Sequence, residues 1–423
     1  MTRRYFGTDG VRGVVGEFLT VELVERLGRA AVLWSGATSV FVGRDTRGSG
    51  PELEAALARG ASSAGADVVL GGVLPTPAVA LAGADLGIVI SASHNPPEYN
   101  GVKFFDRDGH KLPDAAEEQI EALLDAPAPA GVAGAIIHRD GESSASYIDY
   151  VLEKFGSDLT GLRVVVDCAH GAYAGMAPAA FERLGATVET IGDDPDGTNI
   201  NSGCGATDLG ALQAAVVERG FDLGIAFDGD GDRTMAVDEN GKVVDGDEIV
   251  AVLALHLGVD LVAVTQMTNY GFHALMAENN IRVLTTDVGD RYVLEALWRE
   301  GGILGGEQSG HIIYLRDHVT GDGLAAGLLL CAALNGRTLS AAAGVMPRWS
   351  QAKENVRVST KELPPAIGAE VERRNAELAG AGRILVRPSG TEPLIRVLAE
   401  AENEAVAAEA CATIAALVRS ALG

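Results

Sequence analysis

Short apolar runs alternate with longer stretches of helical periodicity along the first part of this chain. The apolar runs 40–42, 68–70 and 86–90 are predicted to be buried strands, because each ends at polar or turn residues. The stretches 20–34 and 51–64 lie between them and have the apolar spacing of amphipathic helices. Strands that alternate with helices in this way predict βαβ units and a parallel sheet.

The same alternation continues along the chain and changes near its end. Further strands are expected at 162–167, 222–227, 261 onward and 281–284, and further helices near 114–125, 175–184, 208–219, 271–279 and 322–335. After a polar stretch at about 350–366, the last part shows strands at 383–386 and 394–400 and an alanine-rich helix at 403–421. The strand openings Asp85-Leu86-Gly87-Ile88 and Asp222-Leu223-Gly224-Ile225 are alike, which indicates a duplicated unit.

These patterns predict an α/β chain of four domains. We expect three similar α/β units with mixed or parallel sheets, followed by a smaller C-terminal α+β domain. The expected limits are 1–150, 151–250, 251–350 and 351–423.

The strand at 86–90 leads into a polar turn that we call the serine loop, Ser91–Pro97. Its Asn-Pro-Pro sequence cannot continue a sheet. Parallel α/β sheets bind ligands beyond the carboxyl ends of their strands, so the hydroxyl of Ser93 and the imidazole of His94 are expected at a site. Taken alone, such a turn would more often be structural. A short strand at 100–105 would bring Lys103 to the same loop.

The strand at 222–227 leads into an acidic loop, Asp228–Arg233, in which aspartates alternate with glycines. Three converging carboxylates would oppose folding by roughly 10 kcal/mol unless a cation lay among them. Hard oxygen ligands on so short a loop suit Mg²⁺, at Asp228, Asp230 and Asp232. A calcium-binding EF-hand is excluded, because Arg233 replaces the glycine of the sharp turn and the flanking segments are predicted strands.

Two further loops offer groups that bind a phosphorylated sugar. The sugar loop, Gly306–His311, contains Glu307, Ser309 and His311, which can bind hydroxyls. The phosphate loop, Arg387–Pro393, and Arg396 beyond it combine hydroxyls, backbone N–H groups and guanidinium groups, which suit a phosphate monoester. The chain has no nucleotide-binding P-loop sequence.

The net charge and the cysteine content of the chain indicate which classes of binding partner to expect. The 423 residues include 33 Lys and Arg against 58 Asp and Glu, a formal net charge of −25. This charge argues against nucleic acid or an anionic membrane as a partner, although a small phosphate ligand needs only local positive charge. The four cysteines are far apart, so neither a zinc cage nor a disulfide framework is indicated. With no signal-peptide pattern, and with the apolar run 324–334 too short to span a bilayer, we expect a cytoplasmic protein.

The serine, acidic, sugar and phosphate loops occur together and in this order, and the set resembles the signature of the α-D-phosphohexomutases. Enzymes of that family have four domains and exchange phosphate between positions 1 and 6 of a hexose. The segments Tyr5–Gly13, Lys103–Phe105 and Val288–Val293, together with Gln308, are most similar to the bacterial branch that acts on glucosamine phosphates.

The resemblance implies an isomerase that works as an intramolecular phosphotransferase. Ser93 would carry a phosphoryl group and complete the Mg²⁺ site with Asp228, Asp230 and Asp232. This group would pass to glucosamine 6-phosphate, and the resulting 1,6-bisphosphate, both intermediate and activator, would return its other phosphoryl group and leave glucosamine 1-phosphate. The product would feed the synthesis of amino-sugar nucleotides and cell-wall precursors.

The resemblance also implies roles for the remaining site residues. The local cations expected around the transferring phosphoryl group are Arg12, His94, Lys103 and Arg233. Among them, Lys103 is the candidate proton acceptor. The residues expected to bind the substrate's second phosphate are Arg387, Ser389, Gly390, Thr391 and Arg396, and those expected to bind the sugar are Glu307, Ser309 and His311.

Two alternatives stay open. A phosphoglucomutase/phosphomannomutase would differ only in its sugar, and Pro97–Gly101 resembles that version of the serine loop. A Mg²⁺-dependent sugar phosphatase would release the phosphoryl group of Ser93 to water. In each case the expected partner is a small phosphosugar, with no nucleic acid and no membrane, and the enzyme would be a monomer or a homodimer.

Overall fold

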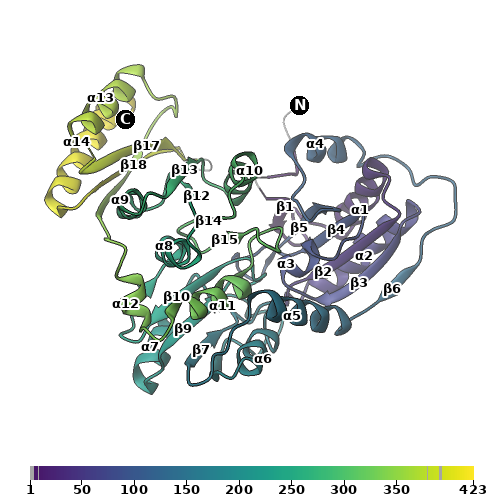
Figure 1. Ribbon diagram of the computed structural model, residues 1–423. Coiled ribbons are helices and arrows are strands. Elements are labelled where there is room, and N and C mark those ends of the chain that lie inside the picture. Colours follow the sequence, from purple (N-terminus) through teal and green to yellow (C-terminus); the bar gives the residue numbers. More distant parts are fainter. Residues whose placement is uncertain (1–3, 8, 379, 390–392) are drawn as a thin grey trace. The chain divides into compact units, whose positions relative to one another are not determined.

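The computed structural model describes residues 4–7, 9–378, 380–389 and 393–423. The chain divides into two compact units. Unit 1 consists of the residues up to 266 together with 283–344, and unit 2 consists of 267–282 and 345–423. Figure 1 shows the helices and strands of both units.

The first sheet of unit 1 has six strands in the order β1-β5-β4-β2-β3-β6. Its strands are β1 (Val11–Val14), β2 (Ser39–Arg44), β3 (Asp67–Val73), β4 (Leu86–Ile90), β5 (Tyr99–Asp106) and β6 (Ile136–His138), and its helices are α1 (Val21–Ser35), α2 (Gly50–Ser63), α3 (Thr76–Ala80) and α4 (Asp114–Ala122). β2 pairs in parallel with β3 and β4, whereas β5 is antiparallel to both β4 and β1. Figure 1 shows α1 and α2 side by side along this sheet.

Two smaller sheets complete unit 1. The five-stranded sheet contains β7 (Arg163–Asp167), β8 (Thr187–Ile191), β9 (Leu223–Phe227), β10 (Thr234–Asp238) and β11 (Val243–Val244), with helices α5 (Glu142–Phe155), α6 (Met176–Arg183) and α7 (Gly210–Arg219). The four-stranded sheet contains β12 (Leu261–Thr265), β13 (Arg282–Thr286), β14 (Leu304–Gly306) and β15 (Ile312–Tyr314). The remaining helices of unit 1 are α8 (Gly246–Leu257), α10 (Asp290–Glu300), α11 (Gly323–Leu334) and α12 (Leu339–Ala343).

The three sheets of unit 1 share one arrangement of four strands. The orders β5-β4-β2-β3, β10-β9-β7-β8 and β15-β14-β12-β13 are equivalent. In each sheet a buried strand (β4, β9 or β14) leads into a polar loop, and the chain returns as the antiparallel neighbour of that strand. The predicted similarity of the three α/β units is confirmed, and the serine, acidic and sugar loops occupy equivalent positions.

Unit 2 contains a three-stranded antiparallel sheet in the order β16-β18-β17. Its elements are β16 (Ser350–Arg357), β17 (Gly382–Pro388), β18 (Leu394–Ala401), α9 (Tyr270–Glu278), α13 (Pro365–Leu378) and α14 (Glu404–Leu422). The smaller C-terminal α+β domain is confirmed. The polar stretch 350–366, expected only to lead into this domain, instead forms β16 and the start of α13. β16 is an edge strand whose residues are mostly half-buried or exposed, so it lacks the apolar run of a central strand.

Side-chain caps explain where several helices begin. Thr20 Oγ1 accepts the N–H of Leu23 at the start of α1, and Asp245 forms a capping box with Glu248 at the start of α8. The predicted domain limits stay predictions. Residues 150 and 250, two of the predicted limits, lie inside helices α5 and α8.

The alanine-rich helix α14 is longer than the apolar run 324–334, which was the segment considered as a possible membrane span in the sequence. Its 19 residues are long and apolar enough, by length and composition alone, to cross a membrane. In the structure Ile414, Ala415 and Val418 on its buried face belong to the hydrophobic core of unit 2. The helix therefore packs as a core helix.

The close approach of α1 and α2 depends on glycine. A Cβ added to Gly60 would lie 1.9 Å from the carbonyl oxygen of Glu25, so Gly60→Ala must push the two helices apart. Overpacking costs about 1–3 kcal/mol, which exceeds the roughly 1 kcal/mol that alanine gains in a helix. We expect a lower free energy of unfolding in urea titrations. Gly368→Ala in α13, where nothing lies within 4 Å, should not destabilise the protein. Equal stability of Gly60→Ala and the parent would contradict this packing.

Candidate active site

The serine loop leaves β4 in an unusual backbone conformation. Ser93 has a φ of 52°, in the left-handed region that non-glycine residues rarely adopt, and it is 1% exposed. Its N–H donates to Ser91 Oγ at 2.9 Å, and its hydroxyl lies 3.3 Å from His94 Nδ1. The same hydroxyl donates to Asp228 Oδ2 at 2.6 Å. The structure therefore brings Ser93 and the acidic loop together.

A buried arginine that sequence reasoning missed holds the serine loop. The guanidinium of Arg47 donates to the carbonyl oxygens of Ser93 and Asn95 at 2.9 and 2.8 Å. It also pairs with Asp45 at 2.9 Å, and Ser91 Oγ donates to the same carboxylate at 2.5 Å. A signal was present, because Asp45 and Arg47 follow the carboxyl end of β2, which lies beside that of β4.

The acidic loop gathers its three carboxylates in the interior. Asp228, Asp230 and Asp232 are each at most 4% exposed, and their ligand atoms lie within 4.8 Å of one another. Burial, followed by repulsion from Asp232 and Asp230, raises the pKa of Asp228 to about 8. Among the described residues, no donor reaches Asp230 Oδ1. Crowded, buried carboxylates with an oxygen left unpaired fit a divalent cation that prefers hard oxygen ligands, such as Mg²⁺.

A second group of possible metal ligands, Asp106, Asp108 and His110, is more exposed. Asp106 Oδ1 already accepts the N–H groups of Asp108 and His110 at 3.0 and 2.9 Å. An oxygen satisfied by its own turn has less need of a cation than the unpaired oxygen of the acidic loop. The acidic loop is therefore the candidate metal centre.

Lys103 connects β5 to the acidic loop. Its Nζ lies 2.6 Å from Asp230, 3.5 Å from Asp232 and 3.4 Å from Asp9. Burial disfavours the ammonium, but the three carboxylates outweigh burial and raise the pKa of Lys103 above its ordinary value. The raised pKa favours the charged ammonium of Lys103, and its role as the proton acceptor stays a prediction.

A chain of ion pairs that sequence reasoning missed runs from the first sheet to the sugar loop. Lys111 Nζ lies 2.8 Å from Asp9 and 2.7 Å from Asp290. His311 lies 3.5 Å from Asp290 and 3.6 Å from Asp232, so the chain ends on the acidic loop. Asp9 and Asp290 lie inside segments that carried the family resemblance, but Lys111, which pairs with both, is distant from each in sequence.

The other three residues expected to be cations differ in charge. Arg12 pairs with Asp9, and Arg233 Nε lies 3.8 Å from Asp232. Burial, followed by the positive charges of Arg233 and Arg12, lowers the pKa of His94 to about 4. His94 is therefore neutral at pH 7 and does not supply the positive charge expected of it.

The sugar loop is a tight turn between β14 and β15. The N–H of Glu307 donates to the carbonyl of His311, and the N–H of Gly310 donates to the carbonyl of Glu307, both at 3.0 Å. Glu307 Oε1 accepts the N–H of Gly289 at 2.9 Å, and Ser309 is exposed. Glu307 is thus fixed by backbone groups on both sides, while the hydroxyl-bearing Ser309 is accessible.

Gln308 braces the sugar loop. Its side-chain Nε2 donates to Asp245 Oδ2 at 3.2 Å, and its backbone carbonyl accepts the N–H of Gly246 at 3.2 Å. These bonds attach the loop to the N-terminus of α8. The side chain on which the expected sugar preference partly rested therefore positions the loop.

The phosphate loop lies in unit 2. Arg387 and Arg396 face each other across β17 and β18, and burial, followed by the charge of Arg396, lowers the pKa of Arg387. Two positive charges directly opposite each other repel, and an anion bound between the two guanidinium groups would offset this repulsion. Lys361, which sequence reasoning missed, donates to the carbonyl of Ser389 at 2.9 Å. The predicted residues Gly390 and Thr391 lie outside the described residues.

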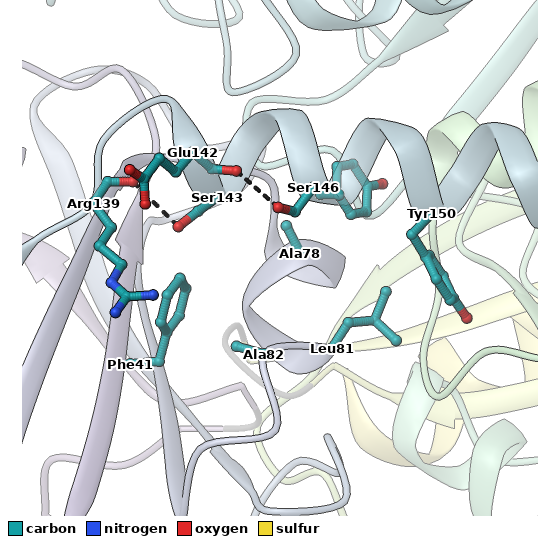
Figure 2. Close-up of a pocket in the computed structure, with 10 residues that line it drawn as sticks. Phe41, Ala78, Leu81, Ala82, Arg139, Glu142, Ser143, Ser146 and Tyr150 are labelled. Atoms are coloured by element: carbon teal, nitrogen blue, oxygen red, sulfur yellow. Dashed lines mark hydrogen bonds between the residues drawn. The ribbon is translucent and has the colours of Figure 1, made fainter.

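A cavity of about 370 Å³ beside α5 has no residue of these loops in its lining (Figure 2). Its lining includes Phe41 and Leu81. Ser143 Oγ donates to the carbonyl of Arg139, and Ser146 Oγ donates to that of Glu142. Because these hydroxyls already have backbone acceptors, the cavity offers no equivalent of the acidic loop.

Comparison with protein families decides the assignment. Phosphoglucomutase/phosphomannomutase models match the chain as alpha/beta/alpha domain I at residues 3–129, domain II at 145–241, domain III at 245–349 and the C-terminal domain at 354–417. The chain belongs to this family.

Individual relatives agree over nearly the whole length. A phosphoglucosamine mutase from Moorella thermoacetica is 51% identical over 94% of this chain and 95% of its own. Another from Symbiobacterium thermophilum is 48% identical over 99% of each chain. A solved phosphoglucomutase/phosphomannomutase family protein from Burkholderia thailandensis has a TM-score of 0.82 at 26% identity, covering 98% of this chain and 97% of that one. The chain is thus an enzyme, an isomerase that transfers a phosphoryl group.

Arg47 offers a direct test of how the serine loop is held. Arg47→Lys keeps the charge but removes the fork that binds the Ser93 and Asn95 carbonyls. A shift of about 1 Å at the reacting oxygen can cost roughly 100-fold, so we expect kcat to fall by about that factor while circular dichroism stays unchanged. Arg44→Lys is the control, because Arg44 pairs with Glu54. Parental turnover in a folded Arg47→Lys enzyme would refute this role.

Proposed function

We propose that this phosphohexomutase interconverts glucosamine 6-phosphate and glucosamine 1-phosphate through a phosphoserine at Ser93 and a 1,6-bisphosphate intermediate. The observation that supports this most strongly is the hydroxyl of Ser93, 2.6 Å from Asp228 at the buried carboxylate cluster. Phosphoryl transfer depends mainly on positioning and charge stabilisation, which a held hydroxyl beside such a cluster provides. The names of the relatives described above support the choice of glucosamine phosphate.

We assign Mg²⁺ to Asp228, Asp230 and Asp232, with the phosphate of Ser93 as a further ligand. When bound, the ion would neutralise charge on phosphoryl oxygens. Arg12 and Arg233 add positive charge at the same place. The protonated Lys103 holds Asp230 in position through its bond of 2.6 Å.

The reaction consists of two transfers in opposite directions. In the first, the bond between phosphorus and Ser93 Oγ breaks, a bond to O1 of glucosamine 6-phosphate forms, and the O1 proton ends on Oγ. In the second, the bond between phosphorus and O6 breaks, a bond to Oγ forms, and the proton ends on O6. Phosphoserine is regenerated, and glucosamine 1-phosphate leaves.

The substrate's second phosphate would bind the phosphate loop. Arg387 and Arg396 provide paired guanidinium groups, and Ser389, Gly390 and Thr391 provide hydroxyl and N–H groups. Glu307, Ser309 and His311 would bind the sugar.

The cellular setting is also part of the proposal. We expect a cytoplasmic monomer or homodimer that is activated by hexose 1,6-bisphosphate and supplies amino-sugar precursors of the cell wall.

A phosphoglucomutase/phosphomannomutase activity is the second candidate. It is supported by the description of the matching family models, phosphoglucomutase/phosphomannomutase. The amide of Gln308 is bound to Asp245 and therefore gives no support to an amino sugar. Both candidates use the same serine, acidic and phosphate loops, so only the choice of sugar separates them.

The phosphoryl group itself is directly measurable. After incubation with hexose 1,6-bisphosphate, intact-mass spectrometry should show one phosphoryl group, and peptide mapping should place it on Ser93. Ser93→Ala removes the acceptor oxygen and should abolish transfer. Ser91→Ala, which loses the bond to Asp45 and the bond from the N–H of Ser93, should still be phosphorylated. A phosphoryl group on Ser91, or undiminished turnover of Ser93→Ala, would rule out the assignment.

The sugar is tested by comparing substrates. We expect kcat/KM for glucosamine 6-phosphate to exceed those for glucose 1-phosphate and mannose 1-phosphate by at least about tenfold, equivalent to roughly 1.4 kcal/mol in the transition state. The measurement is a product assay with the three substrates side by side under identical Mg²⁺ and bisphosphate. Equal or higher kcat/KM for either hexose 1-phosphate would transfer the proposal to the second candidate.

A further inference from the structure

The backbone of the acidic loop is held by three other segments of the chain. The carbonyls of residues 229–231 each accept an N–H from a different segment. In chain order the donors are Ala172 at 2.9 Å, Thr76 at 2.8 Å and Gly323 at 3.0 Å. Because successive carbonyls are fixed by separate segments, the position of each segment sets the position of the metal-binding side chains.

The ring of Tyr173 packs against the same loop. It is fully buried, and its ring centroid lies 4.7 Å from that of Phe227 at the end of β9. A Cβ added to Gly231, which has a φ of 74°, would lie 2.4 Å from the tyrosine ring. Gly231 therefore rests directly on this ring.

Asp322 connects Tyr173 to helix α11. Its Oδ1 accepts the hydroxyl of Tyr173 and the N–H of Ala325, both at 2.9 Å, and thereby caps the helix. Its Oδ2 accepts the hydroxyl of Tyr147 at 2.7 Å and lies 2.8 Å from His318 Nε2. A buried carboxylate with this many donors has little freedom to move. The first N–H of the helix that it caps is the one that holds Gly231.

We propose that Asp322 and Tyr173 are positioning residues that set the affinity and selectivity of the Mg²⁺ site. The inference rests on the proposed assignment of Mg²⁺ to the acidic loop. Asp322 fixes both supports of Gly231, namely the ring beneath it and the helix N-terminus that binds its carbonyl. Mg²⁺ requires near-ideal octahedral geometry, whereas Ca²⁺ accepts irregular sites, so a small displacement of the loop weakens Mg²⁺ binding more than Ca²⁺ binding.

The test is calorimetric titration of Mg²⁺ and of Ca²⁺ into full-length Tyr173→Phe and Asp322→Asn proteins without substrate. Tyr173→Phe keeps the ring and removes the hydroxyl that bonds Asp322, Tyr147 and the N–H of Leu324. We expect its Kd for Mg²⁺ to rise about tenfold, in the range seen when residues behind metal ligands are changed, and its Kd for Ca²⁺ to rise less. Tyr150→Phe is the matched control, because Tyr150 lies on α5 (Figure 2) and its hydroxyl donates to the carbonyl of Asp317.

A lower melting temperature of Tyr173→Phe with Kd for Mg²⁺ within about twofold of the parent, or an equal weakening of both ions, would overturn the proposal. If Asp322→Asn does not fold, Tyr173→Phe alone decides. Because no sugar is present, failure of the glucosamine assignment leaves this measurement unaffected. Absence of Mg²⁺ binding in the parent protein would instead count against the proposed metal site itself.

Discussion

Burying three carboxylates within 4.8 Å of one another is the constraint on which the rest of unit 1 depends. Each pair at such separations repels by about 4 kcal/mol at an effective dielectric of 20. The chain offsets this repulsion with the ammonium of Lys103, with the hydroxyl of Ser93 on Asp228, and with a loop whose backbone is anchored on three sides. The negative charge of the three carboxylates that these groups do not offset is the charge that a divalent cation would neutralise.

One four-strand arrangement, used three times, makes this convergence possible. Each repeat places its polar loop after a buried strand and before an antiparallel return strand. The side chains that chemistry requires can therefore differ between loops while their supports stay the same. Ser93, Asp232 and His311 come from three different sheets, yet contacts within 4 Å link the acidic loop to the other two residues.

The parts predictable from the sequence were those encoded by neighbouring residues. Ser93 and the acidic loop follow apolar runs directly, so the strand rule located both. The role of Arg47 could not be predicted from the sequence, because the carbonyls that it binds lie more than 45 residues away in the chain. The charge states of His94 and Lys103 depend on burial and on partners from other sheets, which residue identity alone does not give. Strand β16 was missed because an edge strand needs no apolar run.

The central claim is that a single divalent cation belongs among the carboxylates of the acidic loop. Mn²⁺ binds the same oxygen ligands as Mg²⁺ and scatters anomalously, so crystals grown with Mn²⁺ locate the ion directly. We expect one anomalous peak in coordination distance of carboxylate oxygens of Asp228, Asp230 and Asp232. No peak there, or a peak only at the surface group of Asp106, Asp108 and His110, would contradict the account.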